Sequence, residues 1–159
     1  MVTALDRSDQ LLISALRRRP RASVSELARR LSLARGTIRT RLDRLEARDV
    51  IRGYGPDVDA SAAGFDVRAF TTLSIAQGRH DPTVARLKMI PEVVEIHTVT
   101  GAGDLLLRIV ATTNDHLHEV LQRVASLPDV DRTETQLALA TPLQRTVADL
   151  IAHELDRSS

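Results

Sequence analysis

The stretch ARGTIRTRLDRLEARDVI, residues 34–51, determines what the N-terminal third of the chain folds into. Its apolar residues Ile38, Leu42 and Leu45 follow the i, i+4, i+7 spacing of a helix that buries one face. On such a helix, small residues occupy the outer face near the first turn, and arginines lie on both of its flanks. The flanking residues are Arg35 and Arg39 on one side and Arg41, Arg44 and Arg48 on the other. The sequence therefore predicts an amphipathic helix with a positively charged solvent face.

A helix of this kind suits the major groove of DNA. In that groove a helix has a phosphate strand on each side and base edges beneath its first turns. Gly36 would let the helix backbone approach the bases closely, because it has no side chain. The alternative is an ordinary solvated face, but its basic residues would normally include lysine, and here all are arginine. We therefore interpret residues 34–51 as a DNA recognition helix.

Two further helices are predicted before it. Residues 5–17 have a helical apolar pattern that ends before Pro20, because proline disfavours helical geometry at the residue that precedes it. Residues 23–31 begin with Ser23 and Glu26, which have the spacing of a capping box. The short break SLA then leads into the recognition helix. Helix, short turn and basic helix together form a known DNA-docking unit, the helix-turn-helix.

Charge is unevenly distributed along the chain. The net charge is +1, yet residues 1–50 hold twelve arginines against six acidic residues, whereas residues 51–159 hold fifteen acidic residues against ten basic ones. This asymmetry favours two functional parts, of which the first meets a polyanion; a charged surface without a partner is the alternative.

Composition also excludes several protein classes. Cysteine is absent, which rules out disulfides and thiolate chemistry and fits a cytosol. No apolar run approaches the length of a membrane span, and the N-terminus does not look like a secretory signal. We therefore expect a cytoplasmic protein with no membrane partner.

The remaining two-thirds of the chain alternates between strand and helix patterns. After a predicted strand or hairpin with a linker at 50–64, the order β-α-β-β-α-β predicts a ferredoxin-like domain, and a C-terminal helix follows it. The predicted strands are 68–76, 92–100, 104–112 and 130–140, and the predicted helices are 81–91, 114–128 and 142–157. The expected fold class is α+β, with a helix-turn-helix domain at 1–50, a strand or linker at 51–64, a ferredoxin-like domain at 65–141 and a helix at 142–159.

The third predicted strand, DLLLRIVAT, is apolar on both faces. Leu105, Leu107 and Ile109 point to one side, and Leu106 and Val110 to the other. Helices of a ferredoxin-like fold cover only one side of the sheet, so the other side needs a cover, and a second copy of the chain is the simplest source. We therefore expect a homodimer, which would place two recognition helices on one side of the DNA. On the last helix, one apolar face is expected from Leu143, Val147, Leu150, Ile151 and Leu155.

The sequence carries no pattern for catalysis or metal binding. His116 and His118 are two residues apart on a predicted helix, so their rings point in different directions and do not form a metal pair. We find no nucleophile–base arrangement, no P-loop and no dinucleotide-binding glycine pattern. We therefore expect no catalytic residues, no metal and no cofactor.

The chain resembles the Lrp/AsnC transcription regulators over about residues 4–141. The most specific matches are RLDRLEARDVIRGY, residues 41–54, and VTGAGD, residues 99–104. The resemblance implies a winged or hairpin-linked helix-turn-helix domain and a ferredoxin-like sensing domain. It also implies dimers that assemble into larger, often octameric, rings, with an amino-acid effector bound between dimers.

Two places depart from the family pattern. Ala34 stands where the family usually has a serine that caps the recognition helix, and such a loss costs about 1 kcal/mol of helix stability. Ala102 and Gly103 stand where the family often has an acidic residue followed by an aromatic one, so the loop loses charge and bulk. The expected pocket is therefore roomier, suited to a larger effector, or unused.

The candidate site residues fall into two groups. Near the recognition helix, an arginine can bridge a guanine, a threonine can meet a thymine methyl, and the remaining polar groups suit phosphates. An intramolecular role for Arg41 and an idle surface position for Ser25 are the alternatives. The effector group is implied by the resemblance. The alternative is that the loop residues only form a turn and that the two threonines only have a structural role on their strand. The DNA group is Ser25, Arg35, Gly36, Thr37, Arg39, Thr40, Arg41 and Arg44, and the effector group is Gly101, Ala102, Gly103, Asp104, Thr133 and Thr135.

We therefore expect a sequence-specific, nucleoid-associated transcriptional regulator whose assembly or DNA affinity is modulated by a small effector, an amino acid. The main alternative is an architectural protein that wraps or bends DNA with little effector control. A remote alternative is an enzyme similar to the sirohaem decarboxylases, which resemble the family in fold. The basic helix argues against it, because an enzyme has no need of such a helix.

Overall fold

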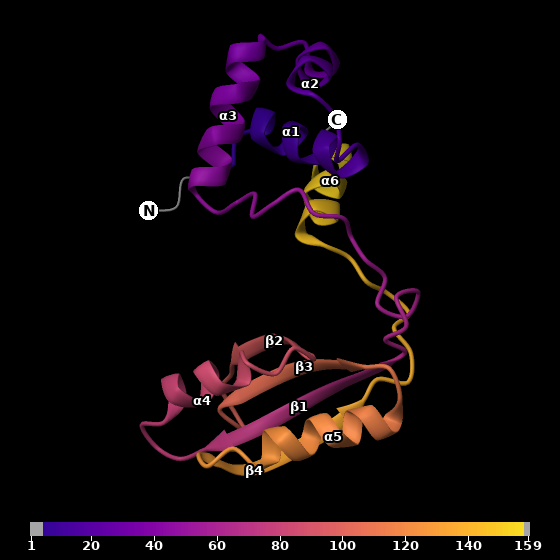
Figure 1. The fold of residues 1–159 in the computed structure, drawn as a ribbon. Coiled ribbons are helices and arrows are strands. Elements are labelled where there is room, and N and C mark those ends of the chain that lie inside the picture. The colour runs from indigo at the N-terminus through magenta and orange to yellow at the C-terminus, as the bar shows by residue number, and fades with distance from the viewer. Residues whose placement is uncertain (1–4, 158–159) are drawn as a thin grey trace. The chain divides into compact units, whose positions relative to one another are not determined.

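The computed structural model describes residues 5–157, and the chain divides into two compact units. One unit consists of the residues up to Asp57 together with those from Leu143 onwards, and the other is Val58–Pro142. The first unit is helical, and the second contains the sheet (Figure 1). The C-terminal helix therefore belongs to the same unit as the predicted helix-turn-helix.

The first unit contains the three predicted N-terminal helices, α1 (Arg7–Arg18), α2 (Val24–Leu31) and α3 (Arg35–Ala47). Local sequence explains where the first two begin, because Asp6 and Ser23 each form a capping box with the third residue that follows. Helix α3 begins after Ala34, which provides no side-chain cap. Helix α3 therefore starts without the side-chain hydrogen bond that the other two helices have.

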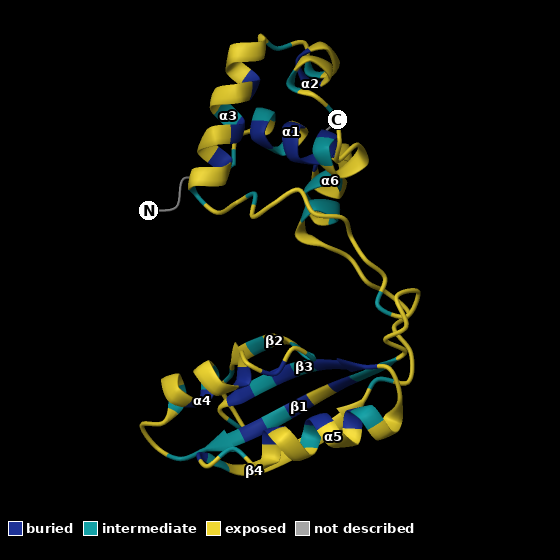
Figure 2. Cartoon of the chain, viewed as in Figure 1, coloured by how far each residue is buried: buried dark blue, intermediate teal, exposed yellow. Residues whose placement is uncertain are grey.

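The core of the first unit is aliphatic. Leu12, Leu27, Ile38 and Leu45 are almost fully buried, and Leu42 is nearly so, which confirms the predicted buried stripe of α3. Figure 2 shows that α3 is buried along the side that meets α1 and exposed on the opposite side. Of the arginines that the sequence singled out, Arg35, Arg39 and Arg44 are exposed, whereas Arg41 and Arg48 are partly buried.

Helix α6 (Val147–Arg157) packs against α1 in this unit, and it is shorter than the predicted helix at 142–157. Thr146 explains the late start, because its backbone N–H donates to the Asp149 carboxylate at 2.8 Å while the Asp149 N–H donates to the Thr146 hydroxyl at 3.3 Å. The predicted apolar face was also wrong in part. Leu155 is buried and Ile151 packs against the core, as predicted, but Leu143, Val147 and Leu150 are exposed, and Ala148 packs against the core in addition.

The predicted strand or hairpin at 50–64 is not found. Residues 52–59 have no regular secondary structure, and residues 60–64 form a turn. An extended segment counts as a strand only when a neighbouring strand pairs with its backbone groups. Within the described chain no strand pairs with this segment, so it is a linker.

The second unit is the predicted ferredoxin-like domain. Its sheet has the order β2-β3-β1-β4, and the pairs β1–β3, β1–β4 and β2–β3 are antiparallel. Helix α4 ends earlier than predicted, at Leu87, and Ile90 in the following turn still reaches the core. The bounds are β1 (Val67–Ile75), α4 (His80–Leu87), β2 (Val93–Thr98), β3 (Leu105–Ala111), α5 (Asn114–Ala125) and β4 (Val130–Leu137).

The two helices of this unit share one side of the sheet. Leu87 of α4 and Val120 of α5 join the same buried cluster as Leu105, Leu107 and Ile109 of β3. The alternation predicted for β3 is therefore confirmed on its helix-covered face. The opposite face, called the open face below, carries Phe70, Leu106, Arg108 and Val110.

Candidate nucleic-acid interface and effector loop

The N-terminal half of α3 is the most accessible part of the candidate interface. Its polar residues are exposed, and the guanidinium groups of Arg35 and Arg39 have no ion pair or hydrogen bond to any residue between 5 and 157. A Cβ added at Gly36 would meet nothing within 4 Å, so the helix surface is open there. Thr37 and Thr40 complete this surface, which offers two cations, two hydroxyls and an open stretch of backbone.

The C-terminal half of α3 is held against α1 by charge. Arg41 Nη1 donates to an Asp6 carboxylate oxygen at 2.6 Å and to an Asp9 oxygen at 2.7 Å, and Arg44 Nη2 donates to Asp9 at 2.6 Å. Asp9 is only 1% exposed, so its carboxylate is surrounded by these two guanidinium groups in place of water. The Arg41 guanidinium, together with the Asp9 backbone N–H, holds the pKa of the Asp6 carboxyl below its ordinary value.

This cluster changes what can be expected of the predicted phosphate contacts. Arg41 is committed inside the unit, with 22% of its side chain exposed, whereas Arg44 keeps 46% exposed beside Asp9. Sequence reasoning missed both aspartates. Asp6 and Asp9 have capping-box spacing, which signals a helix start but does not indicate that a second helix places arginines opposite them.

Ser25 lies exposed in the first turn of α2 and makes no hydrogen bond through its side chain to the described residues. The cap of this helix is Ser23, whose hydroxyl accepts from the Glu26 N–H at 3.2 Å. Ser25 is therefore available to a ligand, although nothing in its surroundings directs it toward one.

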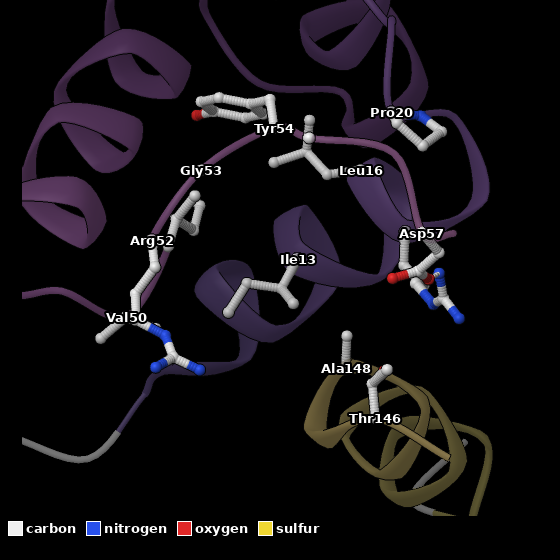
Figure 3. A pocket seen from close by; sticks show the side chains of 13 residues that line it. Ile13, Leu16, Pro20, Val50, Arg52, Gly53, Tyr54, Asp57, Thr146 and Ala148 are labelled. Atoms are coloured by element: carbon white, nitrogen blue, oxygen red, sulfur yellow. Dashed lines mark hydrogen bonds and ion pairs between the residues drawn. The ribbon is translucent and has the colours of Figure 1, made fainter. Parts of the chain in front are cut away.

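A hollow of about 280 Å³ lies among α1, the segment 50–57 and α6 (Figure 3). Tyr54, at its edge, donates its hydroxyl hydrogen to Glu46 of α3. Burial, followed by the contact with Glu46, raises the pKa of Tyr54 to about 12, so the phenol stays protonated at neutral pH. On another side of the hollow, Arg17 pairs with Asp57 and with Asp149, which is 3.0 Å away. These contacts tie the segment after α3 to the body of the unit.

The candidate effector loop is built into the end of β1. The Asp104 backbone N–H donates to the Leu73 carbonyl at 2.8 Å, and the Asp104 carboxylate accepts from the Ile75 N–H at 2.9 Å. Gly103 packs so closely that a Cβ there would lie 2.4 Å from Thr72 Cγ2 and 2.9 Å from the Leu73 carbonyl oxygen. Gly101 has a φ of +115°, a conformation that favours glycine. Ala102, between these glycines, is exposed.

The two threonines of the effector group lie elsewhere on the sheet. Register places Thr133 beside Leu73 and Thr135 beside Thr71, so both are on the helix-covered face of edge strand β4. The hydroxyls of Thr135 and buried Thr71 are 3.0 Å apart. The loop leads into β3, and β1 lies between β3 and β4. Within one chain the two threonines and the loop therefore do not line the same site.

A shallow hollow of about 240 Å³ lies directly beside the loop. Asp104 lines it together with Thr98, Val99, His80 and the turn 75–78. His80 Nε2 and the Thr98 hydroxyl are 2.8 Å apart across it. Sequence reasoning missed His80 and the turn, because a hydrogen bond between α4 and β2 leaves no local pattern.

The open face of the sheet has its own hollow, of about 450 Å³. Val94, Arg108 and Val110 line it from the sheet, and residues of the segment 58–65 line it from the chain that precedes β1. Among the described residues no cluster of histidine, cysteine or carboxylate side chains could hold a metal ion. Across residues 5–157, none of the helices combines the length and apolarity of a membrane span.

Two family models match successive parts of the chain. Residues 5–52 match the winged helix-turn-helix DNA-binding model, and residues 68–148 match the Lrp/AsnC ligand binding domain. Among curated proteins, the HTH-type transcriptional regulator Rv2324 of Mycobacterium tuberculosis is 33% identical over 143 residues, covering 89% of this chain and 96% of the relative. The regulatory protein AsnC of Escherichia coli is 26% identical and covers 90% and 95%, respectively.

Solved structures show the same relationship. The structure of E. coli AsnC superposes with a TM-score of 0.84 at 25% identity, covering 91% of this chain and 99% of that one. The feast or famine regulatory protein from M. tuberculosis complexed with L-methionine gives a TM-score of 0.79 at 32% identity, covering 89% and 96%. The curated relatives are named as regulators and not as enzymes. The chain therefore belongs to the Lrp/AsnC family of DNA-binding transcriptional regulators.

Proposed function

We propose that this regulator recognises a specific operator sequence through the N-terminal half of α3. The observation that carries the proposal is the open surface around Gly36, where Arg35 and Arg39 have no partner among the described residues. An arginine can donate two hydrogen bonds to a guanine, and the methyl groups of Thr37 and Thr40 can meet thymine. Base readout is therefore assigned to this half of the helix.

The neighbouring polar residues are assigned to the phosphate backbone. Arg44 stays nearly half exposed while it pairs with Asp9, so one side of its guanidinium can still meet a phosphate. Ser25 can donate its hydroxyl at the start of α2. Arg41 is less exposed and pairs with both Asp6 and Asp9, so we assign it to holding α3 in place.

Arg39→Ala tests the base readout. If Arg39 reads a base, the variant should lose about 1–3 kcal/mol of operator affinity and lose its preference at one position of the operator. Titrations of operator variants, with Arg132→Ala in the exposed end of β4 as a control, would measure this. An equal loss on every sequence would reassign Arg39 to the phosphate backbone.

We further propose that two chains associate through the open face of the sheet. Phe70 is 38% exposed there, beside partly buried Leu106 and the apolar hollow lined by Val94 and Val110. A second copy would cover this surface and would set two recognition helices at a fixed spacing, and such dimers would build an octamer. Phe70→Glu should shift sedimentation toward the monomer, whereas Met89→Glu, at an 80% exposed site after α4, should leave it unchanged. Equal sedimentation of both variants would contradict this interface.

The effector is proposed to be an amino acid held near the loop 101–104. The structural relative complexed with L-methionine supports this, and so does the hollow beside Asp104. Thr133 and Thr135 are separated from the loop in one chain, so they would contribute only at a contact between copies. Binding would change assembly or the spacing of recognition helices by favouring one of two arrangements.

A thermal-shift screen against the twenty amino acids tests this proposal. A ligand at about 100 times its Kd should stabilise the protein by about 2.7 kcal/mol. A blank screen would contradict the amino-acid proposal and would favour the second candidate function, an architectural DNA-binding protein with little effector control. The observation behind that candidate is the loop itself, because Ala102 and Gly103 offer a ligand no charge and little surface. In either role the protein would act on DNA in the cytoplasm, at the nucleoid.

A further inference from the structure

The chain passes between its two units twice. It leaves the helical unit after Asp57, forms the sheet unit, and returns at Leu143, so α6 completes the unit in which the chain began. These two passages, at residues 57–58 and 142–143, are called the first and second crossing below. A rearrangement of the sheet unit can reach the helical unit through the covalent chain only by way of these crossings.

One side chain near the end of α1 holds both crossings. Arg17 Nη1 donates to the carboxylate of Asp57, the last residue before the first crossing. Arg17 Nε donates to Asp149 at 3.0 Å, and Asp149 lies in the first turn of α6, shortly after the second crossing. A single guanidinium therefore connects two segments that are far apart in the sequence.

The charges around this guanidinium do not balance. Neither Asp57 nor Asp149 has another ion pair among the described residues, so one cation faces two carboxylates. The Arg17 guanidinium, together with the N–H and hydroxyl of Thr146, holds the pKa of Asp149 well below its ordinary value. Asp149 and Asp57 in turn raise the pKa of Arg17. Because two like charges on one cation repel each other, each carboxylate weakens the hold on the other.

The first turn of α6 has little else to hold it. Leu155, near the end of the helix, is buried, whereas Val147 and Leu150 in the first turn are exposed. Ala148 is only partly buried, and it lines the hollow of about 280 Å³. Figure 3 shows Ala148 and Thr146 on the α6 side of this hollow. A segment with few buried apolar contacts opens at a low cost in free energy, so the ion pair with α1 determines how firmly α6 begins.

We propose that Arg17 is a shared clamp for which the two crossings compete. When the first crossing moves and Asp57 leaves, Arg17 pairs with Asp149 alone, and the first turn of α6 is held more tightly. When Asp149 leaves, the segment at Asp57 is held more tightly instead. A rearrangement of the sheet unit thus reaches the helix-turn-helix through the chain itself. The part of this inference that concerns association of two copies rests on the proposed dimer, whereas the competition rests on the contacts of Arg17.

A thiol at position 148 would test the competition, because the chain has no cysteine of its own. In the Ala148→Cys protein, the rate of labelling by a maleimide reports opening of the first turn of α6. In this background Arg17→Gln should raise the rate and Asp57→Asn should lower it, each by about two- to fivefold, the range for exposed ion pairs. Arg18→Gln is the matched control, since Arg18 is exposed on the same helix and has no partner in the described chain.

The expected signs separate opening from a direct effect of charge on the thiol. Loss of a nearby cation would by itself make a thiol less reactive, and loss of a nearby anion would make it more reactive. A rate in Asp57→Asn that is equal to or above that of the parent would overturn the competition. So would an Arg17→Gln rate equal to that of Arg18→Gln. Circular dichroism melting would check that all the variants remain folded.

Phe70→Glu tests whether association of two copies reaches the clamp. This substitution lies in the sheet unit, and it should change the labelling rate of the Ala148→Cys protein when Arg17 is present but not in the Arg17→Gln background. A change of equal size in both backgrounds would mean that a partner copy only shields the thiol, and it would overturn this link. No change in either background would also overturn it. Failure of the proposed dimer would appear separately, as unchanged sedimentation of Phe70→Glu.

Discussion

Helix α3 and the loop 99–104 were both singled out from the sequence as binding elements, but they differ in how far their polar groups are used within the fold. The polar side chains on the N-terminal half of α3 are exposed, and those of Arg35 and Arg39 have no partner in the described chain. In the loop, by contrast, Gly103 packs tightly against β1, and Asp104 already bonds to the backbone of Leu73 and Ile75. The helix carries residues that its own stability does not need, whereas the loop carries residues that its conformation requires.

The difference shows what each kind of pattern can reveal. On a helix, periodicity determines which side chains face water. An excess of arginine on that face is not required by the fold, so it can indicate a ligand. In a tight turn, glycine and aspartate are required by backbone geometry, so the same residues would be present with or without a ligand. The assignment of α3 to DNA is therefore stronger than the assignment of Asp104 to an effector.

The largest effect is expected from Asp9→Asn, which removes the charge that anchors α3. Arg41 and Arg44 would lose the buried carboxylate to which they donate at 2.6–2.7 Å. Breaking a buried ion pair costs about 3–5 kcal/mol, and the exposure of the two arginines reduces the expected loss to about 2–3 kcal/mol. Denaturant unfolding would measure it, with Asp43→Asn on the outer face of α3 as the control. Equal unfolding free energies for the two variants would show that Asp9 is not the anchor.

A pair of glycine substitutions would test the comparison directly. Gly103→Ala places a Cβ against Thr72 and the Leu73 carbonyl, and overpacking of this kind costs about 2 kcal/mol of stability. Gly36→Ala meets nothing within 4 Å and should stabilise α3 by up to about 1 kcal/mol, since alanine is the better helix former.

The two variants should also differ in DNA binding. Gly36→Ala should weaken operator binding in a gel-shift titration if the backbone approaches the bases there, whereas Gly103→Ala should leave it within about twofold once folded. If Gly36→Ala bound the operator as tightly as the wild type, α3 would not lie as deep in the groove as we propose.

Much of the fold could be predicted from the sequence because its elements have strong local signals. The stripe Ile38, Leu42, Leu45 and the alternation of β3 gave the correct buried faces, and the β-α-β-β-α-β order gave the correct sheet. The segment 50–64 was predicted as a strand or hairpin followed by a linker because it alternates in part, yet strand formation depends on a pairing partner that local sequence does not specify. The start of α6 was missed because Thr146 and Asp149 cap it five residues after the predicted beginning.

The candidate sites were less predictable because they depend on contacts between distant residues. The pairing of Asp9 with Arg44 joins residues 35 apart in sequence, and the hydrogen bond of Thr135 with Thr71 joins residues 64 apart. No local pattern encodes such distances. The sequence therefore identified which arginines are on α3, and the structure separated those that pair within the unit from those that have no partner among the described residues.

A smaller effect is expected from Ala34→Ser at the start of α3. Ala34 already has the extended backbone of an N-cap, with φ −65° and ψ 145°, but no side chain that can accept a hydrogen bond. A serine there should add about 1 kcal/mol of stability by accepting from an N–H of the first turn. Denaturant unfolding would show the gain, and Ala34→Val would serve as a control that cannot cap. If the serine and valine variants were equally stable, the end of α3 would not be limited by its missing cap.

The smallest effect is the response of the α1–α3 contact to acid, because Asp6 is half exposed and water screens its charge. The Arg41 guanidinium lowers the pKa of Asp6 below its ordinary value of 3.8 in the folded protein. A carboxyl whose pKa is depressed by folding stabilises the native state fully above its unfolded pKa, and this contribution is lost as the pH falls through the folded pKa. Asp6→Asn keeps a capping side chain without the charge, so the wild type should exceed it in stability near neutral pH and approach it below about pH 3.8. Unfolding measured across this range would decide the matter, since a gap that stayed constant into acid would mean that the charge of Asp6 does not help to hold α3.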